Sequence, residues 1–399
     1  MLNLLNKGNV AGKNERAIRL AGYRLFNLLS AHFLERLLFL GVAIVLPLKM
    51  TGAGQMSIAQ TGLFYSFLLF MYRCTPLLFS YLSRFIRREL IFITGIIIES
   101  ASLLFMAYVQ VPHWSYGFAL LAGIGGGAAA TMMVSLIESA DRDAKMLAGN
   151  SVNHDIFNIH LMLINASAFI SPFFAFFPTR FYQGMMTVIL LILMMFIGNF
   201  FRLGQVGSQE HRIMGCDKLP SFDKRFFLIW VAVLSVWAAC SVVYIILPSL
   251  DAHFLGRDGV NIWLSFDAVV VVALFFLLKH INLFQHNTTF NAGIGLMAIL
   301  AALLLFVLCQ HNFYILLFAL SVLAFGGYLA FGQLYGLAMR TRFTQRKTFY
   351  LGLLSFSGAL GEGGTQAIFW LTRNADASLA ITFTIVLMGL IALLRLGND

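Results

Sequence analysis

The chain alternates between long apolar stretches and short polar segments. Twelve of the apolar stretches are long enough to cross a bilayer as helices, which takes about 20 mostly apolar residues each. They are residues 25–48, 59–82, 89–111, 114–138, 150–177, 183–204, 226–249, 260–281, 289–309, 312–338, 348–372 and 378–396. The pattern predicts an all-α, polytopic membrane protein with twelve transmembrane helices.

One long polar segment divides these spans into two sets of six. We predict a cytoplasmic N-terminal tail at 1–24, an N-terminal six-helix half at 25–204, a cytoplasmic linker at 205–225 and a C-terminal six-helix half at 226–399. Little of the chain is left for any further domain.

Composition agrees with a membrane protein. Of the 399 residues, 60% are hydrophobic and 11% are charged, whereas soluble domains are about half apolar and about a quarter charged. The sequence contains no paired catalytic constellation, and its four cysteines are scattered singly, so we expect no enzyme, no cofactor and no metal site. His154 and Asp155 are types of metal ligand, but no matching cluster accompanies them.

The net charge of +10 is explained by membrane topology. Most of the 27 Lys and Arg residues fall in alternate loops, and only Lys49, Arg180, Arg257 and Arg373 fall in the loops on the other side. Basic residues collect in cytoplasmic loops. Both termini are therefore expected in the cytoplasm, in a plasma membrane such as a bacterial inner membrane. The charge then orients the chain in the lipid bilayer and does not indicate nucleic acid as a partner.

The first two spans carry ionisable residues. His32, Glu35 and Arg36 share one helical face with Phe39, and ionisable groups inside a membrane are functional candidates by default. The alternative is a structural Glu35–Arg36 pair that only fixes helix packing. In the second span, Arg73 lies next to Tyr72 near the middle, where it either faces a cavity or snorkels to a membrane surface.

Several motifs resemble those of the proton-coupled oligopeptide transporter branch of the major facilitator superfamily. "HFLERLLFLG" and "YRCTP" are similar to that family's E-x-x-E-R-F-x-Y-Y-G and Y-x-x-P motifs in the first two helices. "LINASAFISP" resembles its fifth-helix signature, with Asn165 at the signature Asn, and the stretch from "GQLYGLAM" to "GALGEG" resembles its tenth and eleventh helices. The resemblance covers both halves in the right order, and it implies the major facilitator fold, with twelve helices in two six-helix halves.

This sequence also departs from the family's pattern. His32 stands where the family has its leading Glu, although Glu35 and Arg36 are kept. The fourth-helix Lys position is Ala128 and the tenth-helix Glu position is Gln333, so both members of a presumed charge pair are missing. Their joint loss is coherent, because removing only one partner of a buried pair costs about 3–5 kcal/mol.

Three residues of the C-terminal half complete the candidate site. Trp237 in the seventh span can stack on a substrate or simply pack. Asp267 in the eighth span is a candidate cavity residue. Glu362 stands at an eleventh-helix Asn position of the family and is a candidate accessory acid.

These residues lead us to expect a secondary active transporter, a monomer whose partners are a small-molecule substrate and protons. Glu35, Arg36 and His32 are the candidate proton-coupling groups. Tyr72, Arg73, Asn165, Asp267, Gln333 and Trp237 are the candidate substrate-binding residues. Arg73 has no acid close by in the sequence, so it is the preferred partner for a substrate carboxylate.

The expected substrate is a small carboxylate-bearing solute, peptide-like or another organic anion, carried by proton symport with alternating access. One alternative is import or export of a carboxylate metallophore, such as a siderophore, or of a drug-like compound. A second alternative is a transport-inactive membrane receptor with the same fold.

Overall fold

The computed structural model describes most of the chain. The described residues are 12–52, 58–109, 111–147, 156–203, 224–251, 266, 268–274, 276–277, 288–308, 312–340, 347–372 and 375–398. These residues form helices joined by short turns, and no strand occurs among them. The prediction of an all-α protein is confirmed.

The helices follow the predicted spans. The first set is α2 (Gly12–Gly52), α3 (Ile58–Leu82), α4 (Arg88–Val109), α5 (Pro112–Leu147), α6 (Ile156–Ile170) with the short 3-10 helix η1 (Ser171–Phe176), and α7 (Thr179–Arg202). The second set is α8 (Lys224–Asp251), α10 (Thr288–Leu308), α11 (Phe313–Arg340), α12 (Lys347–Thr372) and α13 (Ala375–Asn398). Of the predicted eighth span, 266, 268–274 and 276–277 are described and are helical.

Eight helical segments among the described residues are long and apolar enough to cross a membrane, and the protein is a multi-pass membrane protein. Shorter apolar helical segments are Phe67–Leu82 and Met162–Phe174. Residues 1–11, most of the predicted linker, and His154, Asp155 and Asp267 lie outside the described residues. The division into two domains therefore stays a prediction.

Two prolines shape the helices next to the candidate site. Pro172 lies in the first turn of the 3-10 helix η1, and α6 ends two residues before it at Ile170, because proline has no N–H donor and its ring clashes with the preceding turn. Pro76 lies inside α3, so the Tyr72 carbonyl loses its usual helical donor. A β-carbon at Gly127 of α5 would lie 2.6 Å from that carbonyl oxygen, so α5 approaches α3 closely at this point.

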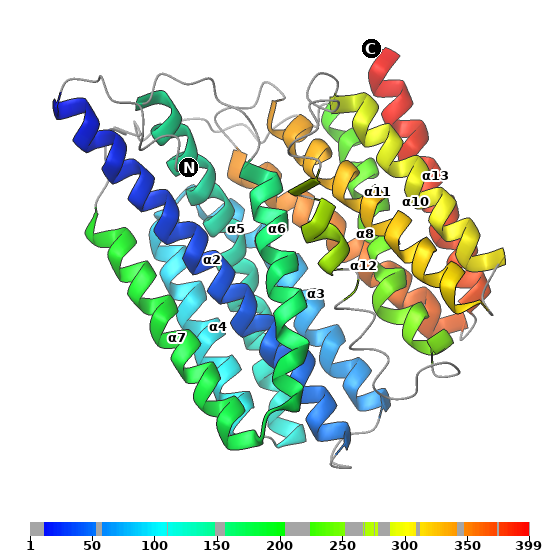
Figure 1. Ribbon diagram of the computed structural model, residues 1–399, viewed down its shortest axis with the longest axis horizontal. Coiled ribbons are helices and arrows are strands. Elements are labelled where there is room, and N and C mark those ends of the chain that lie inside the picture. Colours follow the sequence, from blue (N-terminus) through cyan, green and yellow to red (C-terminus); the bar gives the residue numbers. More distant parts are fainter. Residues whose placement is uncertain are drawn as a thin grey trace.

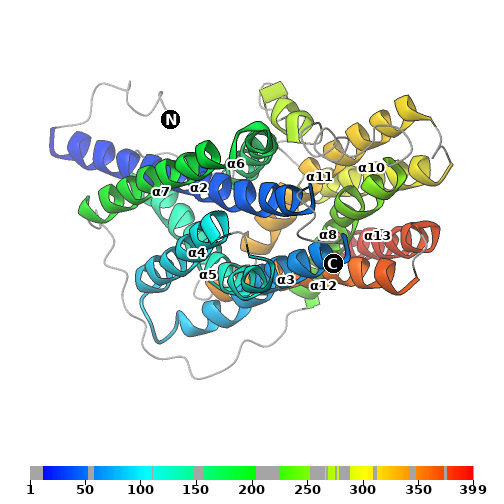
Figure 2. The same cartoon turned by 90° about the horizontal axis from the view of Figure 1, so that it is seen from below.

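The helices gather in two groups, as Figure 1 shows. Helices α2, α3, α4, α5, α6 and α7 form one group, and α8, α10, α11, α12 and α13 form the other. Helix α3 packs against α5 in the first group and against α12 in the second, and Figure 2 shows it between these neighbours. The two groups also touch where α6 meets α11 and where α5 meets α12.

Small residues allow helices to approach closely inside each group. A β-carbon at Gly125 of α5 would lie 2.5 Å from the backbone nitrogen of Glu99 in α4. In the second group, a β-carbon at Gly326 of α11 would lie 2.6 Å from the Gly295 oxygen of α10. Close backbone approach through glycine is typical of helix pairs in membranes, where van der Waals packing drives association.

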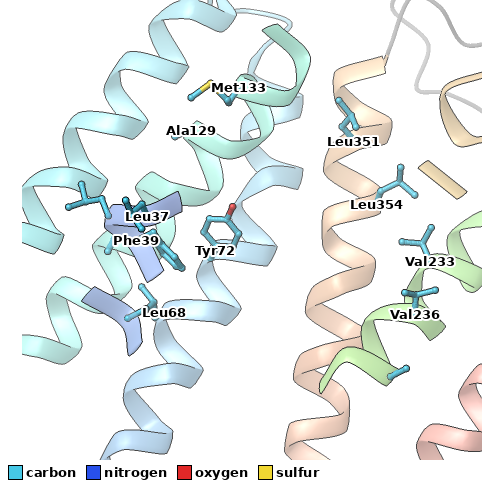
Figure 3. Close-up of a cluster of buried hydrophobic side chains, with 14 of the residues drawn as sticks. Leu37, Phe39, Leu68, Tyr72, Ala129, Met133, Val233, Val236, Leu351 and Leu354 are labelled. Atoms are coloured by element: carbon cyan, nitrogen blue, oxygen red, sulfur yellow. The ribbon is translucent and has the colours of Figure 1, made fainter. Parts of the chain in front are cut away.

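Apolar side chains fill the core on both sides of the boundary between the groups. On one side, Phe39, Leu68 and Tyr72 extend from α2 and α3 (Figure 3). On the other side, the core includes Val233 and Val236 of α8 and Leu351 and Leu354 of α12 (Figure 3). Ionisable side chains buried beside this apolar core are therefore conspicuous.

Candidate functional site

Helix α2 carries three buried ionisable residues at the level of this core. His32, Glu35 and Arg36 are 0%, 2% and 4% exposed. Glu99 of α4 and His160 of α6 join them, and we call these five residues the charge cluster. The shared helical face predicted for the α2 residues thus meets two other helices of the same group.

Arg36 lies at the centre of the charge cluster. Its Nε and Nη2 atoms donate to the two carboxylate oxygens of Glu35, and its Nη2 atom is 3.8 Å from Glu99 Oε1. The guanidinium carbon is 4.7 Å from the Tyr72 ring centroid and 5.0 Å from that of Phe39. The cation is therefore held by two acids and two aromatic faces, which compensates for the loss of water around it.

His32 connects α2 to α6. Its ring stacks on His160, with 4.5 Å between ring centroids and 14° between ring planes, and its Nδ1 atom is 3.7 Å from Glu35 Oε2. Neither His32 nitrogen has a hydrogen-bond partner within the described structure. Beside this stack, the Ser167 hydroxyl of α6 donates to the Phe33 carbonyl of α2 at 3.0 Å.

Glu99 is the member of the charge cluster for which the sequence indicated no role. It is 1% exposed, and neither carboxylate oxygen has a hydrogen-bond partner among the described residues. A β-carbon at Gly126 of α5 would lie 2.7 Å from Glu99 Oε1. The glycine therefore leaves the space that this carboxyl occupies. This contact was not visible in the sequence, because it joins two different helices.

A second polar site, outside the charge cluster, joins the two helix groups. Arg73 of α3 donates from Nε to Glu362 Oε2 of α12 at 3.2 Å. Its guanidinium carbon lies 3.7 Å from the ring centroid of Trp237 in α8, and the hydroxyl of Ser355 in α12 donates to the Arg73 carbonyl at 3.4 Å. We call Arg73, Trp237 and Glu362 the arginine site.

Aromatic side chains extend the arginine site along α11. Trp237 meets Phe331 edge-on with ring centroids 4.9 Å apart, and Phe331 stacks on Tyr335 at 4.5 Å. The Arg73 side chain is 20% exposed, far more than the Arg36 side chain at 5%. The arginine site is thus the more accessible of the two, and the acid that the sequence does not show near Arg73 comes from a distant helix.

The remaining predicted residues lie in several places. Asn165 is half-buried on α6, five positions beyond His160, and Gln333 is half-buried on α11 between Phe331 and Tyr335. Ala128 is buried, and a β-carbon at Gly95 of α4 would lie 3.2 Å from its β-carbon. Its methyl group therefore packs toward α4.

The described residues contain no group of three or more His, Cys, Asp or Glu side chains that could hold a metal ion. What the two sites offer is acid–base chemistry at the charge cluster and a cation with aromatic surfaces at the arginine site.

Comparison with known proteins identifies the fold through structure. No protein-family model matches the sequence, and no curated protein matches it significantly. The fold is that of transporters of the major facilitator superfamily. The protein is similar to the major facilitator superfamily transporter FucP in its outward conformation, with a TM-score of 0.70 and 12% sequence identity over 93% of this chain and 98% of FucP.

A second similar structure is the human organic anion transporter MFSD10 (TETRAN). Its TM-score is 0.67 and its sequence identity is 13%, over 94% of this chain and 99% of that protein. The predicted fold class is confirmed, while the oligopeptide-transporter branch stays a prediction.

Proposed function

We propose that the protein is a secondary active transporter that moves a small solute by alternating access. The major facilitator fold over nearly the whole chain supports this proposal, as does a polar contact between the two helix groups at the arginine site. Transporters of this fold rock one helix group against the other around a site near the bilayer midplane. Arg73, Trp237 and Glu362 come from helices of both groups, as such a site requires.

In the proposed topology, both termini and the junction of α3 with α12 face the cytoplasm of a plasma membrane. There, a β-carbon at Gly352 of α12 would lie 2.8 Å from the Pro76 carbonyl of α3. The guanidinium carbon of Arg84 is 5.4 Å from the ring centroid of Phe349 in α12. The two groups are thus in contact at this end, which corresponds to a state closed toward the cytoplasm.

The proposal of proton coupling rests on the burial of the charge cluster. Five ionisable side chains occupy one region of a membrane-embedded helix group, and such groups mark proton relays. Glu35 and His32 are the predicted carriers, and Arg36 stabilises whichever carboxylate is ionised. We infer symport, in which a proton enters with the solute.

The proposed substrate is a carboxylate-bearing solute that binds Arg73. Its carboxylate would take the place of Glu362 on the guanidinium, because an arginine fork matches any carboxylate, and Trp237 would cover the solute. The displaced Glu362 would then be available to bind a proton. That MFSD10 is an organic anion transporter favours this substrate class over a neutral solute.

Uptake into proteoliposomes tests the proposal. A panel of labelled peptides, organic acids and metal-chelating polycarboxylates is offered with and without an inward proton gradient. At least one carboxylate should accumulate only with the gradient. Accumulation independent of the gradient would refute proton coupling, and binding without any uptake would indicate the transport-inactive receptor.

Variants assign the coupling groups. Glu35→Gln should abolish gradient-driven accumulation and keep counterflow exchange, because exchange needs no net proton movement. His32→Ala and His160→Ala should change the pH profile of uptake. Glu89→Gln on the first turn of α4 is the control and should behave as the native protein. Native driven uptake in Glu35→Gln would exclude Glu35 as the coupling acid.

A further inference from the structure

We propose that Glu99, on α4, is the proton-binding acid of the charge cluster. During transport, Arg36 changes its ion-pair partner from Glu35 to Glu99. This inference rests on the proposed function of proton-coupled transport and assigns its proton to a residue outside the sequence motif. It starts from two observations. Glu99 is 1% exposed, and both of its carboxylate oxygens lack hydrogen-bond partners in the described helices.

The number of charges in the cluster requires one bound proton. Arg36 carries one positive charge, whereas Glu35 and Glu99 together carry two negative charges when both are ionised. In a medium of low dielectric constant an uncompensated charge is costly, so the arrangement is neutral only when one of the two carboxyls is protonated. His32 and His160, stacked face to face, do not remove this need while both imidazoles are neutral.

The geometry places that proton on Glu99. Glu35 accepts two charge-assisted hydrogen bonds from Arg36, which favours its ionised form. Glu99 lies 3.8 Å from Arg36 Nη2, beyond hydrogen-bond distance. An ionised carboxylate in this position would be a second buried negative charge with no donor to stabilise it, whereas a neutral carboxylic acid carries no charge to compensate.

The groups around Glu99 are consistent with this assignment. On α5, Gly125 and Gly126 face it, and the charged residues of that helix lie 12 or more positions further on, about 18 Å along the helix axis. On α7, Tyr182 donates to the Gly41 carbonyl of α2, and Arg180 and Arg202 lie at the two ends of the helix. The ionisable groups near Glu99 are Arg36, Glu35, His32, Tyr72 and His160.

Exchange of Arg36 between the two acids then moves one proton. When the O–H bond of Glu99 breaks, its proton is released and the new carboxylate attracts Arg36, whose Nη2 atom is already 3.8 Å away. Glu35 loses its partner as Arg36 turns, and Glu35 takes up the released proton, so it becomes neutral as Glu99 becomes ionised. Arg36 remains protonated throughout, and the cluster holds one proton before and after the exchange.

Infrared spectroscopy of the purified full-length protein in lipid nanodiscs tests the assignment without any substrate. A protonated carboxyl has a carbonyl stretching band that an ionised carboxylate lacks. At neutral pH we expect this band in the native protein and in the Glu89→Gln control, and we expect its loss in Glu99→Gln. Glu99→Asp should shift the frequency of the band, whereas Glu35→Asp should leave it in place.

Each contrary result has a defined meaning. A band that persists unshifted in both Glu99 variants would overturn the proposal, and a band shifted only by Glu35→Asp would place the proton on Glu35. Because the spectrum requires no transport, it separates this inference from the proposed function. If the band behaves as expected but no solute accumulates with a proton gradient, the proton site stands and the symport proposal fails.

Discussion

Replacing Arg36 by glutamine, alone and together with Glu35→Gln, measures what the ion pair contributes to folding. Arg36→Gln removes the cation from a site where Glu35 accepts two hydrogen bonds and Glu99 lies 3.8 Å away. Breaking a buried pair on one side costs about 3–5 kcal/mol, because it leaves an uncompensated charge. At an effective dielectric constant of about 20, the attraction between Arg36 and an ionised Glu99 alone would be about 4 kcal/mol at this distance, before desolvation.

The double variant should recover part of that loss. With Glu35→Gln added, the carboxylate that needed Arg36 is gone. The remaining acid, Glu99, is neutral in our assignment, so no uncompensated negative charge is left. We expect the double variant to be about 2–3 kcal/mol more stable than Arg36→Gln, within the range of coupling found in one ion-pair network. The assay is equilibrium unfolding in mixed micelles with increasing SDS.

Arg87→Gln is the matched control for this assay. Arg87 Nε lies 3.8 Å from Glu89 Oε2, but the Arg87 side chain is 65% exposed, so its loss should cost less than about 1 kcal/mol. If Arg36→Gln and the double variant unfold at the same SDS fraction, the reasoning is refuted, and Glu35 does not need Arg36 in the folded protein.

Three further predictions follow from the two sites and from helix packing. Arg73→Lys keeps the charge but loses the fork, so it should weaken binding of a carboxylate substrate by about 1.5–3 kcal/mol in a binding titration; native affinity in both Arg73→Lys and Arg73→Ala would leave Arg73 only a packing role. Gly125→Ala should lower the free energy of unfolding by about 1–3 kcal/mol, because its β-carbon would lie 2.5 Å from an α4 backbone nitrogen. Gly184→Ala, which meets no atom within 4 Å, should be nearly neutral, and equal losses would contradict the packing argument. Ala128→Lys should unfold more easily than the native protein, and Gln333→Glu should fail to rescue it, whereas rescue would show that the two positions meet.

The sequence predicts the helices better than it predicts the contacts between them. Span length is fixed by bilayer thickness, so the apolar stretches identify the helices directly. The pair of Glu35 and Arg36 is equally visible, because the residues are adjacent on one helix. The prolines and glycines near the site also have local signatures, since each limits or permits a particular backbone approach.

The contacts of Arg36 with Glu99 and of Arg73 with Glu362 were not predictable in this way. Each pair joins two helices, and its geometry depends on how far each helix is shifted and rotated relative to its neighbour. Helical periodicity gives the face of a residue but not the residue opposite it. The packing of Ala128 toward α4 was not predictable for the same reason, because the motif gives its position in the helix and not the direction of its methyl group.

The close fit of α4 on α5 has a mechanical consequence. Glycines at the contact bring the α5 backbone against the backbone of Glu99 itself, so the two helices cannot slide past each other without a steric clash. The backbone of Glu99 therefore moves together with α5, as part of a rigid pair of helices. A change in the distance between the backbones of Glu99 and Arg36 then requires displacement of α2 relative to the α4–α5 pair, so such a displacement of α2 would change how strongly Arg36 holds each acid.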